Sequence, residues 1–191
     1  MTGSVRTAGQ AAIAPVALRQ ATAVLAGAVL VALGAQVSLP LPGTPVPMTF
    51  QLPAVLVVGG LLGPRLGATS LAAYLLLGAV GLPVFAPMGL PGVARLFGPT
   101  GGYLLALPLA AAVAGAAARP PMRVPRLAAG FLLALVVIHA GGIAQLAILG
   151  GDMAVAWRVG SLPFLAGDVA KILLAGVVVG RLNAPVRRAL L

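Results

Sequence analysis

Two oppositely charged residues, Asp168 and Lys171, lie in a stretch of the chain that is otherwise apolar. Their separation of three residues places both side chains on one face of a helix, where they can partly neutralise each other. A charge at bilayer depth costs about 2.5 to 3.5 kcal/mol on insertion scales, so the pair should face inward. An apolar residue would serve packing without this cost. We therefore favour a polar ligand site, suited to carboxylates or amides, over an ion pair that only locks helices together.

A second group of candidates consists of Arg95, Thr100, Gly101 and Tyr103, which lie in or just before a glycine-rich run. Glycine lets backbone amides approach a ligand closely, and tyrosine offers an aromatic wall with a hydroxyl group. The alternatives are an arginine that reaches lipid headgroups and a tyrosine that anchors a helix at the membrane interface.

Three further polar residues complete the set of candidates. Thr49 and Gln51 follow a proline-dense stretch and could hydrogen-bond a ligand or cap the next helix. His139 lies in an apolar block without an acidic neighbour in sequence. We favour an interhelical hydrogen bond for it over a proton relay.

The composition excludes most catalytic chemistry. The 191 residues are 61% hydrophobic and 7% charged, with no cysteine, one histidine and two acidic residues, so neither thiol chemistry nor an ordinary metal site is expected. The net charge of +10 would suggest nucleic acid in a soluble protein, but here the arginines separate apolar blocks. We expect no nucleic acid partner and no cofactor. No phosphate-binding glycine loop precedes Lys171, so an ATP-driven step requires another chain.

Six apolar blocks predict an all-α, multi-pass membrane protein with a single domain over residues 1–191, because about 20 apolar helical residues cross a bilayer. Gly63-Pro64-Arg65 predicts a tight turn between the second and third blocks, and Ser161 a helix N-cap with Pro163 in the first turn. The predicted spans are residues 16–39, 49–62, 66–84, 103–118, 127–149 and 162–179.

Basic residues test this arrangement, since cytoplasmic loops carry an excess of Lys and Arg. With six spans, nine arginines fall on one side, which predicts that both termini are cytoplasmic and that loops 39–47 and 85–102 are outside. The nine are Arg6, Arg19, Arg65, Arg119, Arg123, Arg126, Arg181, Arg187 and Arg188. Arg95, Arg158 and Asp152 fall on the opposite side. Such a chain belongs in the plasma membrane, in contact with anionic lipids.

Five segments in this order resemble the BioY family, the biotin-specific substrate-binding (S) components of energy-coupling factor transporters. The match covers most of the chain. The segments are Val46-Pro47-Met48-Thr49-Phe50-Gln51, Gly63-Pro64-Arg65-Leu66-Gly67-Ala68, Gly81-Leu82-Pro83-Val84-Phe85-Ala86, Gly98-Pro99-Thr100-Gly101-Gly102-Tyr103 and Leu162-Pro163-Phe164-Leu165-Ala166-Gly167-Asp168-Val169-Ala170-Lys171.

The resemblance implies a six-helix fold that captures biotin from outside and works with a transmembrane coupling protein and two cytosolic ATPases. It also implies that Asp168 and Lys171 contact the polar part of biotin. In that family, Arg and Asn side chains near the third-to-fourth loop complete the pocket. Arg95 matches the arginine, but the only asparagine here, Asn183, lies in the expected cytoplasmic tail, and Met88 to Pro91 departs from the family pattern.

High-affinity biotin binding for uptake, without enzymatic activity, is therefore the favoured hypothesis. One alternative is a self-sufficient secondary transporter driven by protons through Asp168, although inverted repeats with broken helices are not evident. The other is an intramembrane enzyme with His139 or Asp168 as general base, which lacks a nucleophile paired with a base.

Overall fold

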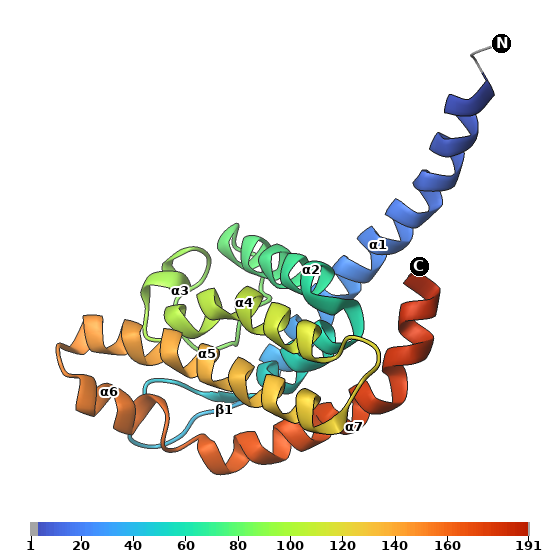
Figure 1. Ribbon diagram of the computed structural model, residues 1–191. Coiled ribbons are helices and arrows are strands. Elements are labelled where there is room, and N and C mark those ends of the chain that lie inside the picture. Colours follow the sequence, from blue (N-terminus) through green and yellow to red (C-terminus); the bar gives the residue numbers. More distant parts are fainter. Residues whose placement is uncertain (1–3, 191) are drawn as a thin grey trace.

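The computed structural model describes residues 4–190, and the side chains of residues 16–188 and 190. The chain is mostly helical, as the sequence predicts, with one two-stranded hairpin. Its elements are α1 (Ser4–Gln36), β1 (Ser38–Leu39), β2 (Met48–Thr49), α2 (Gln51–Ala79), α3 (Ala94–Phe97), α4 (Gly101–Ala117), α5 (Val124–Gly150), α6 (Met153–Gly160) and α7 (Leu165–Leu190). Figure 1 shows the helices packed around α2 and α4, with the beginning of α1 projecting beyond the others.

Within the described residues, three helical stretches are long and apolar enough to cross a membrane: Val16–Gln36, Gln51–Ala79 and Val124–Gly150. A fourth span results if α6 and Leu165–Arg188, which meet at a bend of 53°, are taken together. The apolar helix α4, Gly101–Ala117, is shorter. The multi-pass prediction is thus supported by these helices, while the count of six spans and the cytoplasmic termini remain predictions.

Helix α2 is broken at Gly63, where the predicted tight turn lies. Gly63 has φ of 82° and ψ of 178°, a non-helical conformation that glycine tolerates. Pro64, which follows, has no backbone N–H with which to continue the helical hydrogen bonds. The two halves then pack against each other, because a Cβ built on Gly67 would lie 2.9 Å from the Cα of Gly59. In a straight helix these two residues would be about 12 Å apart. The predicted blocks 49–62 and 66–84 are therefore two helical segments joined by a sharp turn.

The core depends on small residues that let helix backbones touch. A Cβ on Gly59 would lie 2.3 Å from the carbonyl oxygen of Ala111 on α4, and one on Gly115 would lie 2.4 Å from the carbonyl carbon of Gly63. Such contacts are typical of membrane helices, where close packing rather than water exclusion holds helices together. Large apolar side chains, including Val80, Leu76 and Leu173, remain exposed on the outside, as expected for a lipid-facing surface.

Several helix ends differ from the prediction. The first block ends at Gln36 rather than Leu39, because the chain turns into the hairpin in which Ser38 pairs with Thr49. The second block begins at Gln51, and the third ends at Ala79 instead of Val84. The fourth and fifth blocks correspond to α4 and α5 within three residues at each end.

The largest correction concerns the segment after α5. Helix α6 was not predicted, and Ser161 is its C-cap instead of an N-cap. Pro163 precedes the next helix, which begins at Leu165 because Ser161 to Phe164 form a turn closed by the Phe164 N–H and the Ser161 carbonyl. Helix α7 then continues to Leu190, so the expected basic tail is helical.

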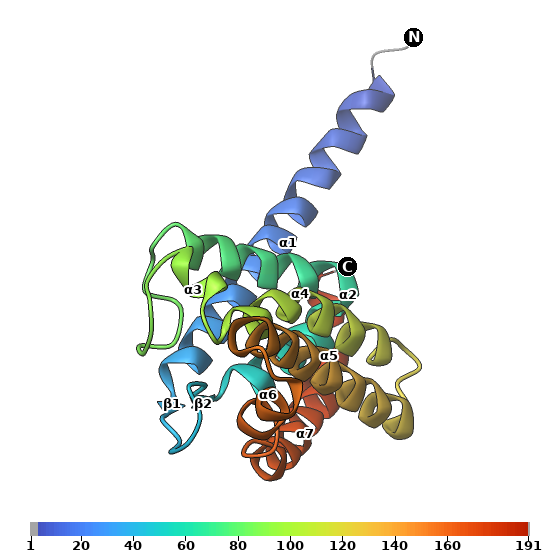
Figure 2. The ribbon, with the colours of Figure 1, turned by 90° about the vertical axis from the view of Figure 1, so that its left-hand side faces the viewer.

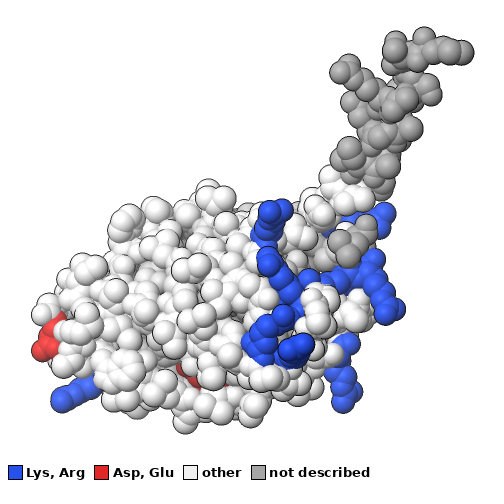
Figure 3. All heavy atoms as spheres, viewed as in Figure 1, with Lys and Arg blue, Asp and Glu red and all other residues white. Residues whose placement is uncertain are grey.

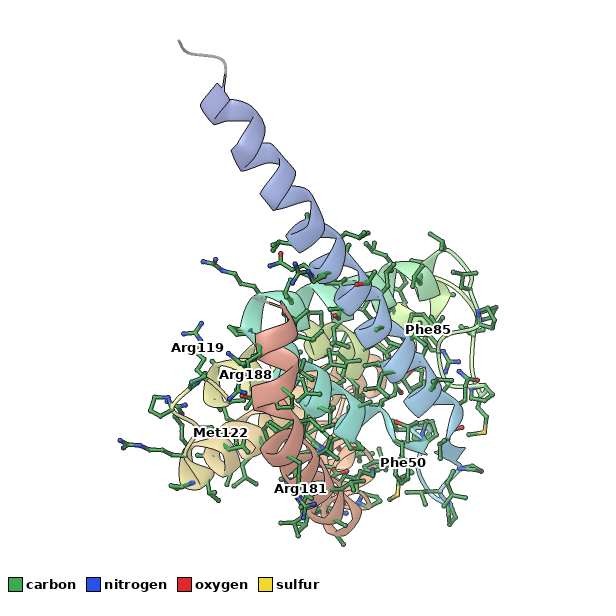
Figure 4. The ribbon with its side chains drawn as sticks, turned by 90° about the vertical axis from the view of Figure 1, so that its right-hand side faces the viewer. Phe50, Phe85, Arg119, Met122, Arg181 and Arg188 are labelled. Atoms are coloured by element: carbon green, nitrogen blue, oxygen red, sulfur yellow. The ribbon has the colours of Figure 1, made fainter. Side chains whose placement is uncertain are left out.

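Charge is divided between the two ends of the molecule. Figure 3 shows Lys and Arg side chains gathered at one end of the molecule, here called the arginine end. The elements there are the break in α2 with Arg65, the α4–α5 loop with Arg119 and Arg123, the first turn of α5 with Arg126, and the end of α7. Figure 4 shows Arg119, Arg181 and Arg188 projecting from that loop and from α7. The side chain of Arg6 lies outside the described ones.

The opposite end, here called the loop end, consists of hairpin 38–49, segment 80–100 and α6. Figure 2 shows the hairpin and the segment around α3 along the same side of the molecule. Asp152 caps α6 there, accepting from the N–H groups of Ala154 and Val155. The charge division that the sequence predicts is therefore present, with the site described below open toward the less charged end.

Candidate functional site

A buried cluster of charge centres on Asp168, in the first turn of α7. Its Oδ1 accepts a hydrogen bond of 3.1 Å from the Lys171 Nζ, and its Oδ2 lies 2.9 Å from the His139 Nε2. Asp168 is 3% exposed, and Lys171 and His139 are each 8% exposed. Little solvent screens these charges, so the donors on both carboxylate oxygens contribute strongly to keeping Asp168 in place. The predicted inward orientation of the pair is correct.

The cluster extends to the link between α6 and α7. The Ser161 Oγ lies 2.7 Å from the His139 Nδ1, so both ring nitrogens have partners. Aromatic rings frame the imidazole: its centroid is 6.2 Å from that of Tyr103 and 6.5 Å from that of Phe164. The interhelical hydrogen bond predicted for His139 is confirmed. Its partner, 29 residues away on another helix, was not foreseen.

A cavity beside this cluster contains an empty volume of about 740 Å³, part of it open to the exterior. Its wall is mostly apolar, with Phe85, Leu107 and Ile138 among its residues, and the buried charges lie on this wall. The structure brings seven of the eight predicted site residues together around it: Thr49, Gln51, Arg95, Thr100, Tyr103, Asp168 and Lys171. An apolar cavity with a few convergent polar groups is typical of a small-molecule site.

Gly101 is the exception among the predicted residues. It is not part of the cavity wall, because it lies at the start of α4 against α3, where an added Cβ would be 1.9 Å from the Leu96 carbonyl oxygen. Its glycine is required for helix packing. The backbone N–H of Gly101 donates to the Gly98 carbonyl, and an approach of this amide to a ligand stays a prediction.

Polar side chains from three further elements, β2, α2 and α4, also line the cavity. The Gln51 amide donates to the Tyr74 hydroxyl over 3.0 Å, and the Thr49 hydroxyl donates to the Gln51 side-chain oxygen over 3.3 Å. Thr49 also accepts from the Gln51 backbone N–H over 3.3 Å, although the N-cap of α2 is Phe50, and it lines the cavity. Tyr103 donates to the Gly160 carbonyl over 2.6 Å, which fixes α4 to the end of α6.

Arg95 holds the loop before α3 in a closed shape. Its guanidinium donates to the carbonyl oxygens of Ala86, Met88 and Leu90, and the side chain is 6% exposed. Burial lowers the pKa of this guanidinium from its ordinary value, and the nearby Tyr74 partly opposes the shift. An arginine that reaches toward lipid headgroups is excluded by this burial. Met88 to Pro91, which departs from the family pattern, is the segment that this arginine clasps.

Asn183 is buried far from the cavity. Its amide donates to the carbonyls of Gly60 and Ala118, on the break of α2 and the end of α4. It therefore joins helices at the arginine end and does not supply the asparagine that the family resemblance implies for the pocket. In the described residues, no group of three or more His, Cys, Asp or Glu side chains could hold a metal ion.

His139 is the functional candidate that the sequence alone did not assign to the site. The only available signal was a polar residue in an apolar helix, which equally describes a packing histidine. Its neighbours Ser161 and Asp168 reach it only through the bend between α6 and α7.

Comparison with known proteins identifies the family. Residues 6–188 match the BioY family. The chain is 39% identical over 154 residues to the "Probable biotin transporter BioY" of Pyrococcus horikoshii, covering 81% of this chain and 90% of that protein. It is 38% identical over 154 residues to the "Biotin transporter BioY" of Thermotoga maritima, covering 81% and 89%.

A solved structure agrees with these relatives. The S-component for biotin from an ECF-type ABC transporter superimposes with a TM-score of 0.78 at 25% identity, covering 87% of this chain and 92% of that one. These relatives are transporter components and not enzymes. The family match spans residues 6–188 and the fold agrees with that of the solved relative, and the chain belongs to the BioY family.

Proposed function

We propose that this chain is a biotin-binding subunit that captures the vitamin with high affinity at the loop end for uptake into the cell. The relatives named above are biotin transporters, and the cavity contains chemistry that suits biotin. The observation that carries the proposal is the Asp168–Lys171 pair, buried yet on the wall of an otherwise apolar cavity.

Biotin combines an apolar bicyclic body with a ureido group that has two N–H donors and one carbonyl acceptor. In the proposed complex, the Asp168 carboxylate accepts a ureido N–H, and the Lys171 ammonium donates to the ureido oxygen. Phe85 and Phe164 contribute apolar contacts to the bicyclic body. Because a buried charge without partners is costly, a ligand lacking these polar groups would bind poorly.

The opening of the cavity suits the carboxylate end of biotin. A second recess, between hairpin 38–49 and residues 88–100, shares Arg95 and Thr100 with the cavity wall. A guanidinium has five N–H donors, and three loop carbonyls do not exhaust them. We place the valerate chain along this opening, with its carboxylate near Arg95.

The arrangement in the membrane follows from the same features. The two halves of α2 together with α1, α4, α5 and α7 supply six helical segments, which supports six spans. The arginine end faces the cytoplasm by the excess of positive charge, and the loop end faces outside, in the plasma membrane.

The transport step requires partners. No nucleotide-binding loop is evident in the sequence, whereas the structural relative is the S-component of an ECF-type ABC transporter. We therefore propose a transmembrane coupling protein and cytosolic ATPases as partners of this chain.

Equilibrium binding of biotin to the detergent-purified protein tests the proposal, with Lys171→Ala beside the wild type. Binding that this substitution abolishes would support both substrate and site, whereas absence of binding by the wild type would refute the assignment to biotin. In liposomes, ATP-dependent uptake with the coupling module is expected. Uptake by the chain alone that follows the proton gradient would instead support a secondary transporter.

A further inference from the structure

His139 lies where three parts of the chain meet. Helix α5 supplies the imidazole, the α6–α7 link supplies Ser161, and α7 supplies Asp168. The two hydrogen bonds are 2.9 Å and 2.7 Å long, and Ser161 is 1% exposed. Both partners of the ring are thus fixed by the fold and shielded from water.

This geometry determines where the hydrogen of a neutral ring lies. The Asp168 carboxylate can only accept, so His139 must carry its hydrogen on Nε2 to bond with it. The lone pair on Nδ1 is then free to accept the Ser161 hydroxyl hydrogen. Ser161 does not select this tautomer, because a hydroxyl group can donate or accept, but its contact with Nδ1 fixes the orientation of the ring against Asp168.

We propose that His139 is a positioning residue for ligand recognition: oriented by Ser161, it holds Asp168 as a pure hydrogen-bond acceptor and thereby selects ligands that donate N–H. The inference rests on the proposed function, because it concerns how the same site distinguishes one end of a ureido group from the other. With Lys171 on Oδ1 and His139 on Oδ2, the carboxylate cannot rotate away or act as a donor. Its remaining lone pairs accept from the ligand and repel a ligand carbonyl or carboxylate.

A purely structural role for His139 would be to tie α5 to α7. The two roles differ in which ring nitrogen matters and in which ligand is affected. A tie between helices would serve every ligand equally, whereas positioning of Asp168 affects only ligands that donate a hydrogen bond to it.

Three substitutions separate these roles. Glutamine can place its amide nitrogen near the position of Nε2, asparagine reaches only that of Nδ1, and leucine removes both. We expect His139→Gln to bind biotin within about threefold of wild type, and His139→Asn and His139→Leu to bind roughly tenfold or more weakly. Thermal stability in detergent, measured for each variant, shows whether loss of affinity only follows loss of folding.

Ligand analogues provide the sharper comparison. Two biotin analogues, each methylated on one ureido nitrogen, lack one N–H donor apiece. For the analogue that lacks the N–H facing Asp168, His139→Leu should change the affinity by less than about twofold. Equal loss of affinity for biotin and both analogues, or no loss for biotin with any of the three variants, would overturn the proposal.

A measurement without ligand separates this inference from the proposed function. His139 is the only histidine in the chain, so imidazole-¹⁵N labelling of protein purified without a histidine tag gives signals from this ring alone. We expect hydrogen on Nε2 in the wild type and a tautomer mixture in Asp168→Asn, whose amide can donate as well as accept. Hydrogen on Nδ1 instead, or on both nitrogens at neutral pH, would overturn the positioning role. The expected tautomer in a protein that fails to bind biotin would overturn the proposed function and leave the geometry of His139 supported.

Discussion

Replacing Lys171 by methionine removes the ammonium group while keeping most of the side-chain volume. In the wild type, the Nζ is 3.1 Å from the Asp168 Oδ1, and both side chains are nearly inaccessible to solvent. After the substitution, His139 is the one side-chain hydrogen-bond partner left to the carboxylate among the described residues. Breaking a buried pair by removing one partner typically costs about 3 to 5 kcal/mol, because the remaining charge is uncompensated. We therefore expect a marked loss of thermal stability.

Biotin binding should fall for a second reason. The ligand loses a charge-assisted hydrogen bond to its ureido oxygen, an interaction worth about 1.5 to 3 kcal/mol. This corresponds to a rise in Kd of roughly 10- to 150-fold. Arg158→Met is the matched control, because Arg158 is an exposed cation on α6 at the same end of the molecule, and its Kd should change by less than about twofold.

The double variant Asp168→Asn/Lys171→Met separates stability from binding. It removes both charges together, so no buried charge is left unpaired, and its stability should approach that of the wild type. Its biotin affinity should stay low, because neither the carboxylate nor the ammonium is present. Calorimetric titration gives the affinities, and thermal unfolding in detergent gives the stabilities. A Lys171→Met protein with unchanged Kd, or a double variant that regains binding, would refute this account of the site.

Three further predictions concern packing, the loop clasp and topology. Gly59→Ala should destabilise the fold by about 1 to 3 kcal/mol, because its Cβ would meet the Ala111 carbonyl. Gly176→Ala, whose Cβ would meet nothing within 4 Å, should be tolerated, and the unfolding midpoints of the two variants measure the difference. Arg95→Lys should speed biotin dissociation roughly tenfold in stopped-flow chase experiments, since an ammonium cannot make the several loop hydrogen bonds of the guanidinium. An unchanged rate would contradict the role of Arg95 in holding this loop. The chain has no cysteine, so Arg123→Cys and Arg158→Cys should react with an impermeant maleimide from opposite sides of the membrane, and labelling from one side would contradict six spans.

Local sequence signals predicted the features that depend on neighbouring residues. The Gly63-Pro64 pair predicts the break in α2, because a residue with positive φ followed by proline cannot continue a helix. Asp168 and Lys171 are visible as charges at helical spacing in an apolar stretch, and the structure places them together on the cavity wall. In both cases, the physics acts within a few residues.

Features that depend on the fold were missed. His139 and Asp168 are 29 residues apart, and nothing in the sequence of α5 indicates which helix its polar residue faces. Ser161 has the residue type of an N-cap, but its hydroxyl bonds to His139 and the next helix begins four residues later. Helix α6 has only eight residues, too few for a clear periodic pattern.

The hairpin at the opening has a consequence for how fast and how tightly a ligand is held. Pro40, Pro42, Pro45 and Pro47 restrict φ at four positions between β1 and β2 before any ligand arrives. A flexible loop of the same length would lose conformational entropy on closing over a ligand, at about 1 to 2 kcal/mol for each residue whose backbone becomes fixed. A stiff rim avoids most of that loss, so more of the free energy of the contacts inside the cavity would remain as affinity for the proposed ligand.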